Sequence, residues 1–152
     1  MSERECDGFL DSHKWARVAS VSPGGEPTVS PVGYVWLGGR LWFYGRATGR
    51  RLKDIEAGSR LAICVDDGVG EGEGYTERRG VVVYGTARVV PPGDPVLDRV
   101  RAAFAANHFG DSKTDFRRRT HSWIEVTPYR RTSWDYSRIP PGTDRFANGG
   151  GR

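Results

Sequence analysis

Three basic side chains stand close together where a helix is predicted to begin. Arg50, Arg51 and Lys53 fall within four positions, and Gly45 and Gly49 precede them. The free N–H groups of a helix N-terminus and the planar guanidinium group of arginine both suit an anion, phosphate in particular. Two arginines at a helix start are slightly unfavourable for the helix dipole unless an anion is bound. The pattern therefore suggests a phosphate site; the alternative is a solvated helix face that binds nothing.

A strand and a short helix must position these side chains. Residues 40–45, RLWFYG, are rich in aromatic residues and predict a strand. Thr48 is the expected N-cap of a helix over residues 49–58, which Gly58 ends. The basic residues would thus lie at the junction of a strand and a helix.

The rest of the chain predicts a mainly β protein. Further strands are expected at 14–21, 28–37, 59–66, 80–90 and 121–128, with 130–137 as a candidate extension of the last. Other helices are expected at 3–12 and from the PPGDP segment (91–95) to about residue 108. Turn-forming segments at 22–27 and 38–39 join strands as hairpins. Six strands with two to three short helices predict a small six-stranded antiparallel barrel.

Length and composition fit one compact domain. The chain has 152 residues with 21 glycines and 9 prolines, which is typical of a fold with many turns. We expect the domain to span residues 1–137 and residues 138–152 to form a flexible tail. The net charge of +4 is a modest basic bias, compatible with a phosphorylated cofactor or with nucleic acid.

Cysteine usage and hydrophobicity suggest a soluble cytoplasmic protein. Cys6 and Cys64 are far apart in sequence and match no metal-binding spacing, so a reducing compartment fits best. The first ten residues carry charges where a signal peptide needs an apolar core. No segment approaches the length of a membrane span, so no membrane partner is expected.

The segment from Ala16 to Asp67 resembles a known family. It reads ARVASVSPGGEPTVSPVGYVWLGGRLWFYGRATGRRLKDIEAGSRLAICVDD. This is similar to the split-barrel flavin-binding proteins related to pyridoxamine 5'-phosphate oxidase. The order of elements matches over residues 14–90 and more weakly over 121–137. The resemblance implies a six-stranded antiparallel split β-barrel that binds FMN or the deazaflavin F420.

The resemblance also implies where the cofactor binds. In that family the phosphate is held by a strand, a loop and a helix start that read aromatic–Thr and then Ser–Arg–Lys. The matching residues here are Tyr44, Gly45, Arg46, Thr48, Gly49, Arg50 and Arg51. Gly45 and Gly49 replace two hydroxyl residues of the pattern, and Thr48 is expected to supply one hydroxyl instead.

A second matching segment, VSPVGYV at 29–35, implies a strand whose backbone lies along the flavin ring. The cofactor-binding residues expected there are Val29, Ser30, Pro31 and Val32. Proline and glycine within a strand also fit a bulged edge strand that binds nothing.

Departures from the family pattern limit the inferred activity. Val29 and Tyr34 stand where the true oxidases carry basic residues, and SWDYSRIPPGTDRF lacks their Arg-x-His substrate motif. The resemblance therefore supports the fold and the cofactor site, but not vitamin B6 oxidation. We expect an FMN-dependent oxidoreductase that transfers hydride to or from a small organic substrate. The alternatives are an F420-dependent reductase, or a non-catalytic flavin- or haem-binding protein.

The family's subunits pair so that the cofactor lies between them, which implies a homodimer. The sequence identifies neither catalytic residues nor the substrate. Its three histidines are scattered, and no metal site is expected. A nucleic-acid-binding barrel is a weaker alternative, because the acids Asp111, Asp115 and Glu125 interrupt its basic and aromatic residues. Those basic and aromatic residues are Lys113, Arg117, Arg118, Arg119, Arg130, Arg131, Trp123 and Trp134.

Overall fold

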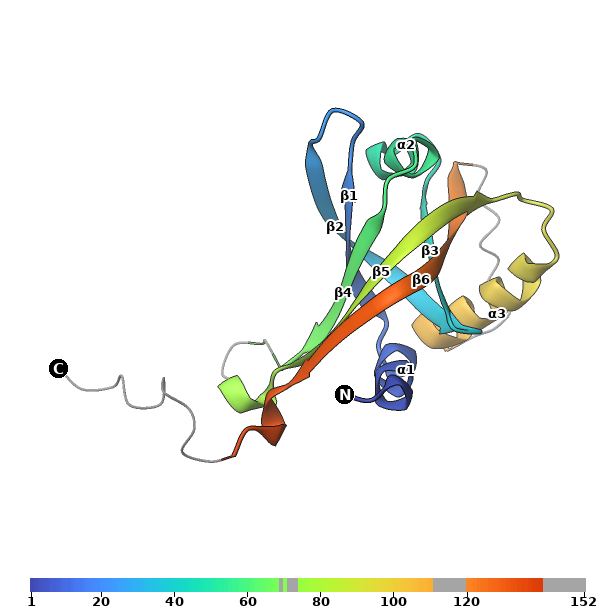
Figure 1. The fold of residues 1–152 in the computed structure, drawn as a ribbon. Helices are drawn as coiled ribbons and strands as arrows, with labels where there is room; N and C mark the ends of the chain where they lie inside the picture. The colour runs from blue at the N-terminus through green and yellow to red at the C-terminus, as the bar shows by residue number, and fades with distance from the viewer. Residues whose placement is uncertain (69, 71–73, 111–119, 141–152) are drawn as a thin grey trace.

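The computed structural model describes residues 1–68, 70, 74–110 and 120–140. Its helices are α1 (Glu3–Ser12), α2 (Arg50–Glu56) and α3 (Val96–Phe109), and its short 3-10 turns are η1 (Tyr75–Glu77) and η2 (Tyr136–Arg138). Its strands are β1 (Trp15–Val21), β2 (Pro27–Leu37), β3 (Arg40–Arg46), β4 (Leu61–Asp67), β5 (Arg79–Val90) and β6 (His121–Asp135). Within these described ranges, the strands pair antiparallel and close a barrel in the order β1-β2-β3-β6-β5-β4 (Figure 1). The predicted six-stranded barrel with three short helices is confirmed.

The barrel is split between β2 and β3. The first half of β2, Pro27–Gly33, pairs with β1, and only its second half, Tyr34–Leu37, pairs with β3. β3 pairs with β6 along Leu41–Arg46, and beyond Phe43 this is its one remaining strand pairing among the described residues. β2 and β3 therefore separate, and within the described part of the chain one edge of the first half of β2 has no strand partner.

Proline at position 31 is compatible with this free edge. The backbone N–H of Tyr34 donates to the carbonyl oxygen of Lys14 at 3.0 Å, which sets the phase of the β1–β2 ladder. Antiparallel ladders alternate, so Val29, Pro31 and Gly33 direct their backbone groups away from β1 and toward the split. The missing N–H of Pro31 therefore costs no ladder hydrogen bond.

Helix α3 covers the outer face of β3 and β6 and reaches β2 at Gly33. A Cβ atom at Gly33 would lie 2.8 Å from Cε1 of His108 and 3.3 Å from Cζ of Phe104. The His108 Nε2–H donates to the carbonyl oxygen of Tyr34 at 3.0 Å. The close approach expected at this glycine is therefore made by α3.

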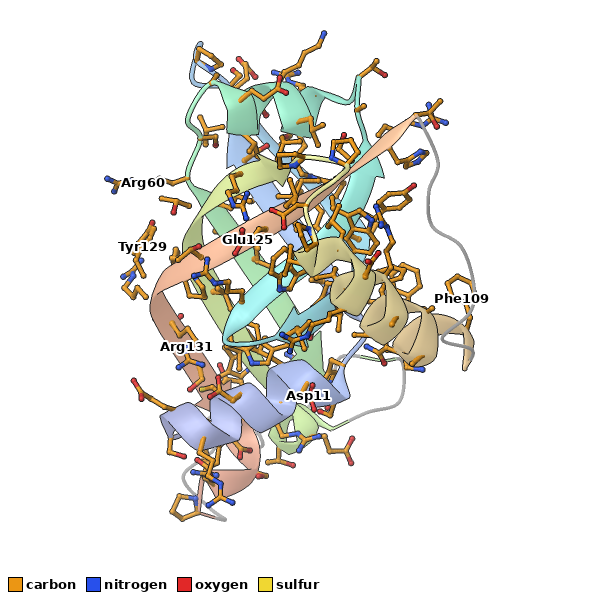
Figure 2. The ribbon with its side chains drawn as sticks, turned by 90° about the vertical axis from the view of Figure 1, so that its right-hand side faces the viewer. Asp11, Arg60, Phe109, Glu125, Tyr129 and Arg131 are labelled. Atoms are coloured by element: carbon orange, nitrogen blue, oxygen red, sulfur yellow. The ribbon has the colours of Figure 1, made fainter. Side chains whose placement is uncertain are left out.

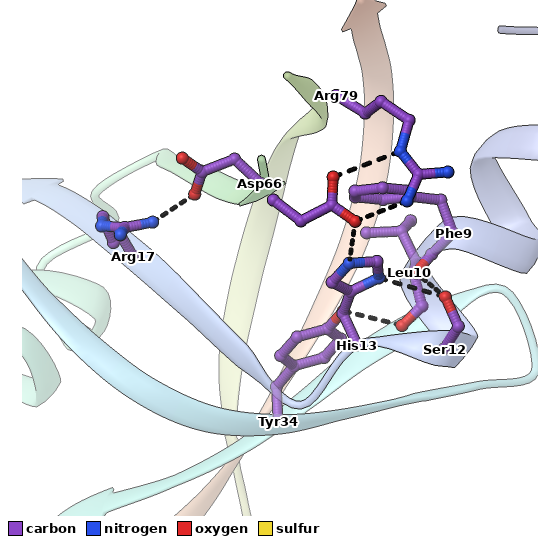
Figure 3. Close-up of polar contacts among 9 residues, drawn as sticks. Phe9, Leu10, Ser12, His13, Arg17, Tyr34, Asp66 and Arg79 are labelled. Carbon is purple, nitrogen blue, oxygen red and sulfur yellow. Dashed lines mark hydrogen bonds and ion pairs between the residues drawn. The ribbon is translucent and has the colours of Figure 1, made fainter. Parts of the chain in front are cut away.

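Helix α1 closes the end of the barrel opposite α2 (Figure 1). The buried Tyr34 hydroxyl donates to the carbonyl oxygen of Leu10 at 2.7 Å. Nε2 of His13 lies 3.1 Å from Oδ2 of Asp67, and Arg79 donates to the same carboxylate at 2.7 Å (Figure 3). These contacts tie the helix to β2, β4 and β5.

Strand β6 continues through Pro128 by means of a bulge. Gly85 is opposite Pro128 and Tyr84 is opposite Arg130, so Tyr129 is an extra residue in the ladder. The proposed extension over 130–137 is confirmed as far as Asp135.

Some predicted segments lie outside the described residues. They are residues 111–119 between the predicted helix and the last strand, residues 69 and 71–73 between two predicted strands, and the expected tail from 141 onward. At the start of that tail, Arg138 ends η2 and its guanidinium donates to Glu5 at 2.5 Å and to Asp135 at 3.0 Å. None of the helices in the described part of the chain has the length and apolar character needed to cross a membrane.

Candidate functional site

A polar pocket of ≈ 280 Å³ occupies the split beneath the start of α2. Its walls come from β2, from the end of β3 and from the β3–α2 junction. The lining residues are Thr28, Ser30, Gly45, Arg46, Gly49, Arg50, Arg51 and Leu52. Six of these eight are positions that the sequence assigned to a cofactor site.

The β3–α2 junction is a tight turn that glycine permits. The Gly49 N–H donates to the carbonyl oxygen of Arg46 at 3.0 Å, and a Cβ at Gly49 would lie 3.1 Å from that oxygen. Gly49 is the N-cap of α2 and makes no side-chain cap, so the prediction of Thr48 as N-cap was wrong. Leu52 and Ile55 pack into the barrel core and fix the helix over the split.

Three arginines converge on this pocket without a carboxylate partner. Among the described residues, no ion pair is made by Arg46, Arg50 or Arg51. Arg51 is half-buried, with its guanidinium 5.6 Å from the ring centroid of Phe43, and burial lowers the pKa of that guanidinium. Arginine stays charged at neutral pH despite such a shift. A partly desolvated cation with no anion beside it marks a place where a bound anion is stabilised.

A larger pocket elsewhere has a different electrostatic character. It measures ≈ 540 Å³ and lies between α1, the β2–β3 turn and the bulge in β6. Its Arg40 donates to Glu125 at 2.6 Å, and its Arg131 contacts Asp7 at 2.5 Å. Arg40 and Arg131 are thus paired with carboxylates. The guanidinium of Arg130 lies over the Tyr84 ring at 3.9 Å, and the lining itself includes the acids Glu3 and Asp7. The pocket in the split, whose lining has no acid among the described residues, is therefore the better anion site.

Five sequence-assigned residues do not line the pocket. The side chains of Val29 and Pro31 face solvent, and Val32 is in the core. The Tyr44 ring stacks on His121 and contacts Trp123, both with ring centroids 4.9 Å away. Thr48 is exposed beside the site and does not supply the expected hydroxyl. The backbone of the first half of β2 still borders the split.

The sequence reasoning assigned Ser30 to the cofactor site but missed Thr28, the other hydroxyl residue that lines the pocket. Thr28 and Ser30 share the inward face of β2 with Val32, Tyr34 and Trp36. Val29, between Thr28 and Ser30 on the outward face of the strand, is 67% exposed. In a half-buried strand the inward-facing residues are usually apolar and the outward-facing ones polar, whereas here Thr28 and Ser30 face inward and Val29 faces outward. This reversed alternation is visible in the sequence and could have identified Thr28.

The matching family model agrees with this architecture. A model of the pyridoxamine 5'-phosphate oxidase family matches residues 2–135. The chain belongs to this family. No curated protein matches the chain significantly.

Solved structures with the same fold are distant in sequence. A conserved hypothetical protein from Mycobacterium tuberculosis has a TM-score of 0.76 and 24% identity, over 90% of this chain and 86% of the other. A FAD-binding protein from Mesorhizobium loti has a TM-score of 0.68 and 22% identity, over 88% and 92%. A FAD- and haem-binding protein from Mycobacterium smegmatis has a TM-score of 0.72 and 20% identity, over 99% and 79%. At these identities the likeness shows the fold.

Within the pyridoxamine 5'-phosphate oxidase family, this chain uses two of its β2 positions differently. The Tyr34 side chain is fully buried and holds α1, and burial raises the pKa of its phenol. Val29 points outward and carries no charge. Neither position can supply the cationic contacts that the sequence comparison noted as missing.

Proposed function

We propose that this chain binds FMN and acts as a flavin-dependent oxidoreductase on a small organic substrate. The observation that carries the proposal is the convergence of Arg46, Arg50 and Arg51 on one pocket, all three without a carboxylate partner in the described part of the chain. These side chains would hold the cofactor phosphate through charge-assisted hydrogen bonds. The Ser30 hydroxyl, which also lines the pocket, would add a further donor.

The free edge of β2 suits the planar part of a flavin. Backbone groups of Val29, Pro31 and Gly33 point into the split, where no strand formed by the described residues pairs with them. Such groups need hydrogen bonds, and the polar edge of a flavin ring offers both donors and acceptors. Pro31 contributes only its carbonyl oxygen, so this stretch of the edge is richer in acceptors than in donors.

When bound, the flavin supplies the hydride chemistry. The described residues that line the pocket include no histidine, carboxylate, cysteine or lysine. The chain's own part is therefore to bind, to orient and to exclude water. F420 is the alternative cofactor, because the same phosphate contacts serve it.

A cofactor titration tests this proposal. We expect purified protein to show a flavin absorption spectrum, or to quench FMN fluorescence on titration with saturation at one site per chain. Reduction of the bound flavin by NAD(P)H or by a reduced substrate should then be observed. Failure to bind FMN, FAD or F420 would remove the proposal.

A second candidate function is cofactor binding without turnover. The similar structure from Mycobacterium smegmatis is described as binding both FAD and haem. The pocket lining also lacks an acid–base pair. A bound flavin that no reductant or substrate reduces, or a Soret band on haem titration, would favour this candidate.

A homodimer with the cofactor at the subunit interface is also proposed. The pocket, at ≈ 280 Å³, is smaller than the roughly 300–1,000 Å³ typical of sites for molecules of this size. It accommodates the phosphate end of a flavin and needs another wall for the rest. The side chains of β1 and β2 that face outward beside the split are largely apolar. They include Trp15, Ala19, Val21, Val29 and Pro31.

Exposure supports a second copy as the missing wall. Trp15 and Val29 are 66% and 67% exposed, and Phe109, at the end of α3, is 59% exposed and points away from the barrel (Figure 2). Apolar side chains exposed this far and grouped beside a site are typical of interfaces.

Light scattering tests the dimer. We expect a dimer at micromolar concentration, and Val29→Lys should shift it toward monomer while weakening FMN binding, because the second wall is lost. A wild-type monomer that binds FMN with full affinity would contradict the composite site. Arg17→Lys, which keeps the charge at a neighbouring outward position of β1, is the matched control.

Other features bear on compartment and on the nucleic-acid alternative. Cys6 and Cys64 are both unpaired thiols, which supports a cytoplasmic location. Trp123 is buried at 3% exposure under α3, so its ring is covered and offers no face for base stacking. Residues 117–119 lie outside the described residues.

A further inference from the structure

A hydrogen-bonded chain runs from a buried carboxylate into the pocket. Asp54, on the inner side of α2, is 2% exposed, and Ser20 on β1 is 1% exposed. The Ser20 hydroxyl donates to Oδ2 of Asp54 at 2.8 Å, and its Oγ lies 2.9 Å from Oγ1 of Thr28. Thr28 is directly opposite Ser20 in the β1–β2 register and lines the pocket. The three groups come from three different elements.

The carboxylate sets the direction of both hydroxyl protons. An ionised carboxylate only accepts, so the single proton of Ser20 is used toward Asp54. Ser20 can then take part in its contact with Thr28 only as acceptor, and Thr28 must donate to it. The Thr28 oxygen is left with lone pairs alone on its pocket side.

The rest of the polar lining has the opposite polarity. The three arginines only donate. Among the described residues, Ser30 Oγ has no hydrogen-bond partner and its proton is free to turn into the pocket. Among the polar side chains described in the pocket lining, Thr28 is therefore a fixed acceptor, whereas the arginines donate and Ser30 is free to donate.

We propose that Thr28, oriented by Asp54 through Ser20, makes the pocket select an anion that carries a proton donor beside it. The class of ligand with that chemistry is a polyol phosphate, whose hydroxyl donates to Thr28 while its phosphate meets the arginines. A dianion without a proton to donate would face the lone pairs of the Thr28 oxygen and could form no hydrogen bond with it. The inference rests on the proposed function and deepens it: Thr28 determines specificity, and Ser20 and Asp54 are positioning residues.

The burial of Asp54 fits this role. A buried carboxylate carries a desolvation cost that a single hydroxyl donor offsets only in part. An asparagine or a serine at this position would hold α2 to β1 equally well, but would leave the protons of Ser20 and Thr28 free to reverse. A carboxylate is the group that forbids the reversal.

The experiment compares two probes on four proteins. The probes are FMN, which has ribityl hydroxyls next to its phosphate, and sulfate, a dianion with no proton to donate at neutral pH. The proteins are the wild type, Thr28→Val, Thr28→Ser and Asp54→Asn. FMN dissociation constants are measured by fluorescence quenching, and sulfate affinities by competition against FMN, with melting of each protein as a folding control.

We expect Thr28→Val to weaken FMN by roughly three- to tenfold, the range of one lost neutral hydrogen bond, without weakening sulfate. Thr28→Ser should restore FMN binding. Asp54→Asn should weaken FMN by a similar factor and tighten sulfate, because Thr28 can then turn its proton into the pocket. A merely structural role for Asp54 would not tighten sulfate.

Other results overturn the inference. They are equal losses for FMN and sulfate in Thr28→Val, a Thr28→Ser variant as weak as Thr28→Val, or an Asp54→Asn variant that binds FMN like the wild type. If Asp54→Asn fails to fold, the comparison of Thr28→Val with Thr28→Ser still tests the role of Thr28. A wild type that binds none of FMN, FAD and F420 would overturn the proposed function as well. If the wild type binds FMN and Thr28→Val binds it equally tightly, this inference alone is overturned.

Discussion

Replacing Arg50 and Arg51 together with alanine should weaken FMN binding about a hundredfold or more. Both side chains line the pocket, and neither has a carboxylate partner among the described residues. A hydrogen bond to a charged group contributes roughly 1.5–3 kcal/mol, so losing two removes about 3–6 kcal/mol of binding free energy. The measurement is FMN titration of the double variant against the wild type.

The empty double variant should melt close to the wild type. Arg50 is exposed, and for Arg51 the lost contact with the Phe43 ring is partly offset by relief from burying a charge. Lys53→Ala is the matched control: Lys53 is on the same helix, is exposed and does not line the pocket. Its affinity should stay within about twofold of the wild type. Unchanged affinity in the double variant would mean that the arginines face water and bind nothing.

Phe43→Ala should lower the free energy of unfolding by about 3–5 kcal/mol, the largest stability effect that we expect. Phe43 is fully buried in the barrel core, opposite Tyr34 on β2 and Ile124 on β6. Truncating such a ring removes its transfer free energy and leaves a cavity. For a chain of this length that corresponds to a fall in the melting temperature of about 10 °C or more.

Thermal or urea unfolding of the cofactor-free protein measures this effect. Phe43→Leu is the control, and we expect it to cost about 1–2 kcal/mol because most of the apolar volume remains. Phe43 also lies at the last point where β2 and β3 are paired, next to the split. A Phe43→Ala variant as stable as the wild type would show that the core does not depend on packing at this position.

Local patterns in the sequence were sufficient for the elements of the fold. The helix over 49–58 and the strand over 40–45 each lie within two or three residues of α2 and β3. The turn expected at 38–39 is present between β2 and β3, and its two residues, Gly38 and Gly39, have positive φ of 62° and 71°. These features depend on backbone conformational preference and on near neighbours, which the sequence states directly.

The candidate site was predicted unevenly for the same reason. Arg50 and Arg51 were found because their neighbourhood is contiguous in sequence. Thr28 was missed because it reaches the pocket from β2, 22 positions before Arg50. The contact of Gly33 with His108 of α3, 75 positions later, was not predicted either. Contacts between distant segments depend on pairing and packing that no local window contains.

By itself, the sequence determined the strand and helix order, the turns and the cluster of arginines, because these depend on residues within a few positions of one another. The tertiary structure alone decided what the inner face of β2 meets. Along that strand the inside of the barrel changes from core, at Val32 and Tyr34, to pocket, at Thr28 and Ser30, because β3 stays paired with β6 but separates from β2. A period of two assigns residues to faces, but only the register of the neighbouring strands decides whether a face meets a core, a ligand pocket or solvent.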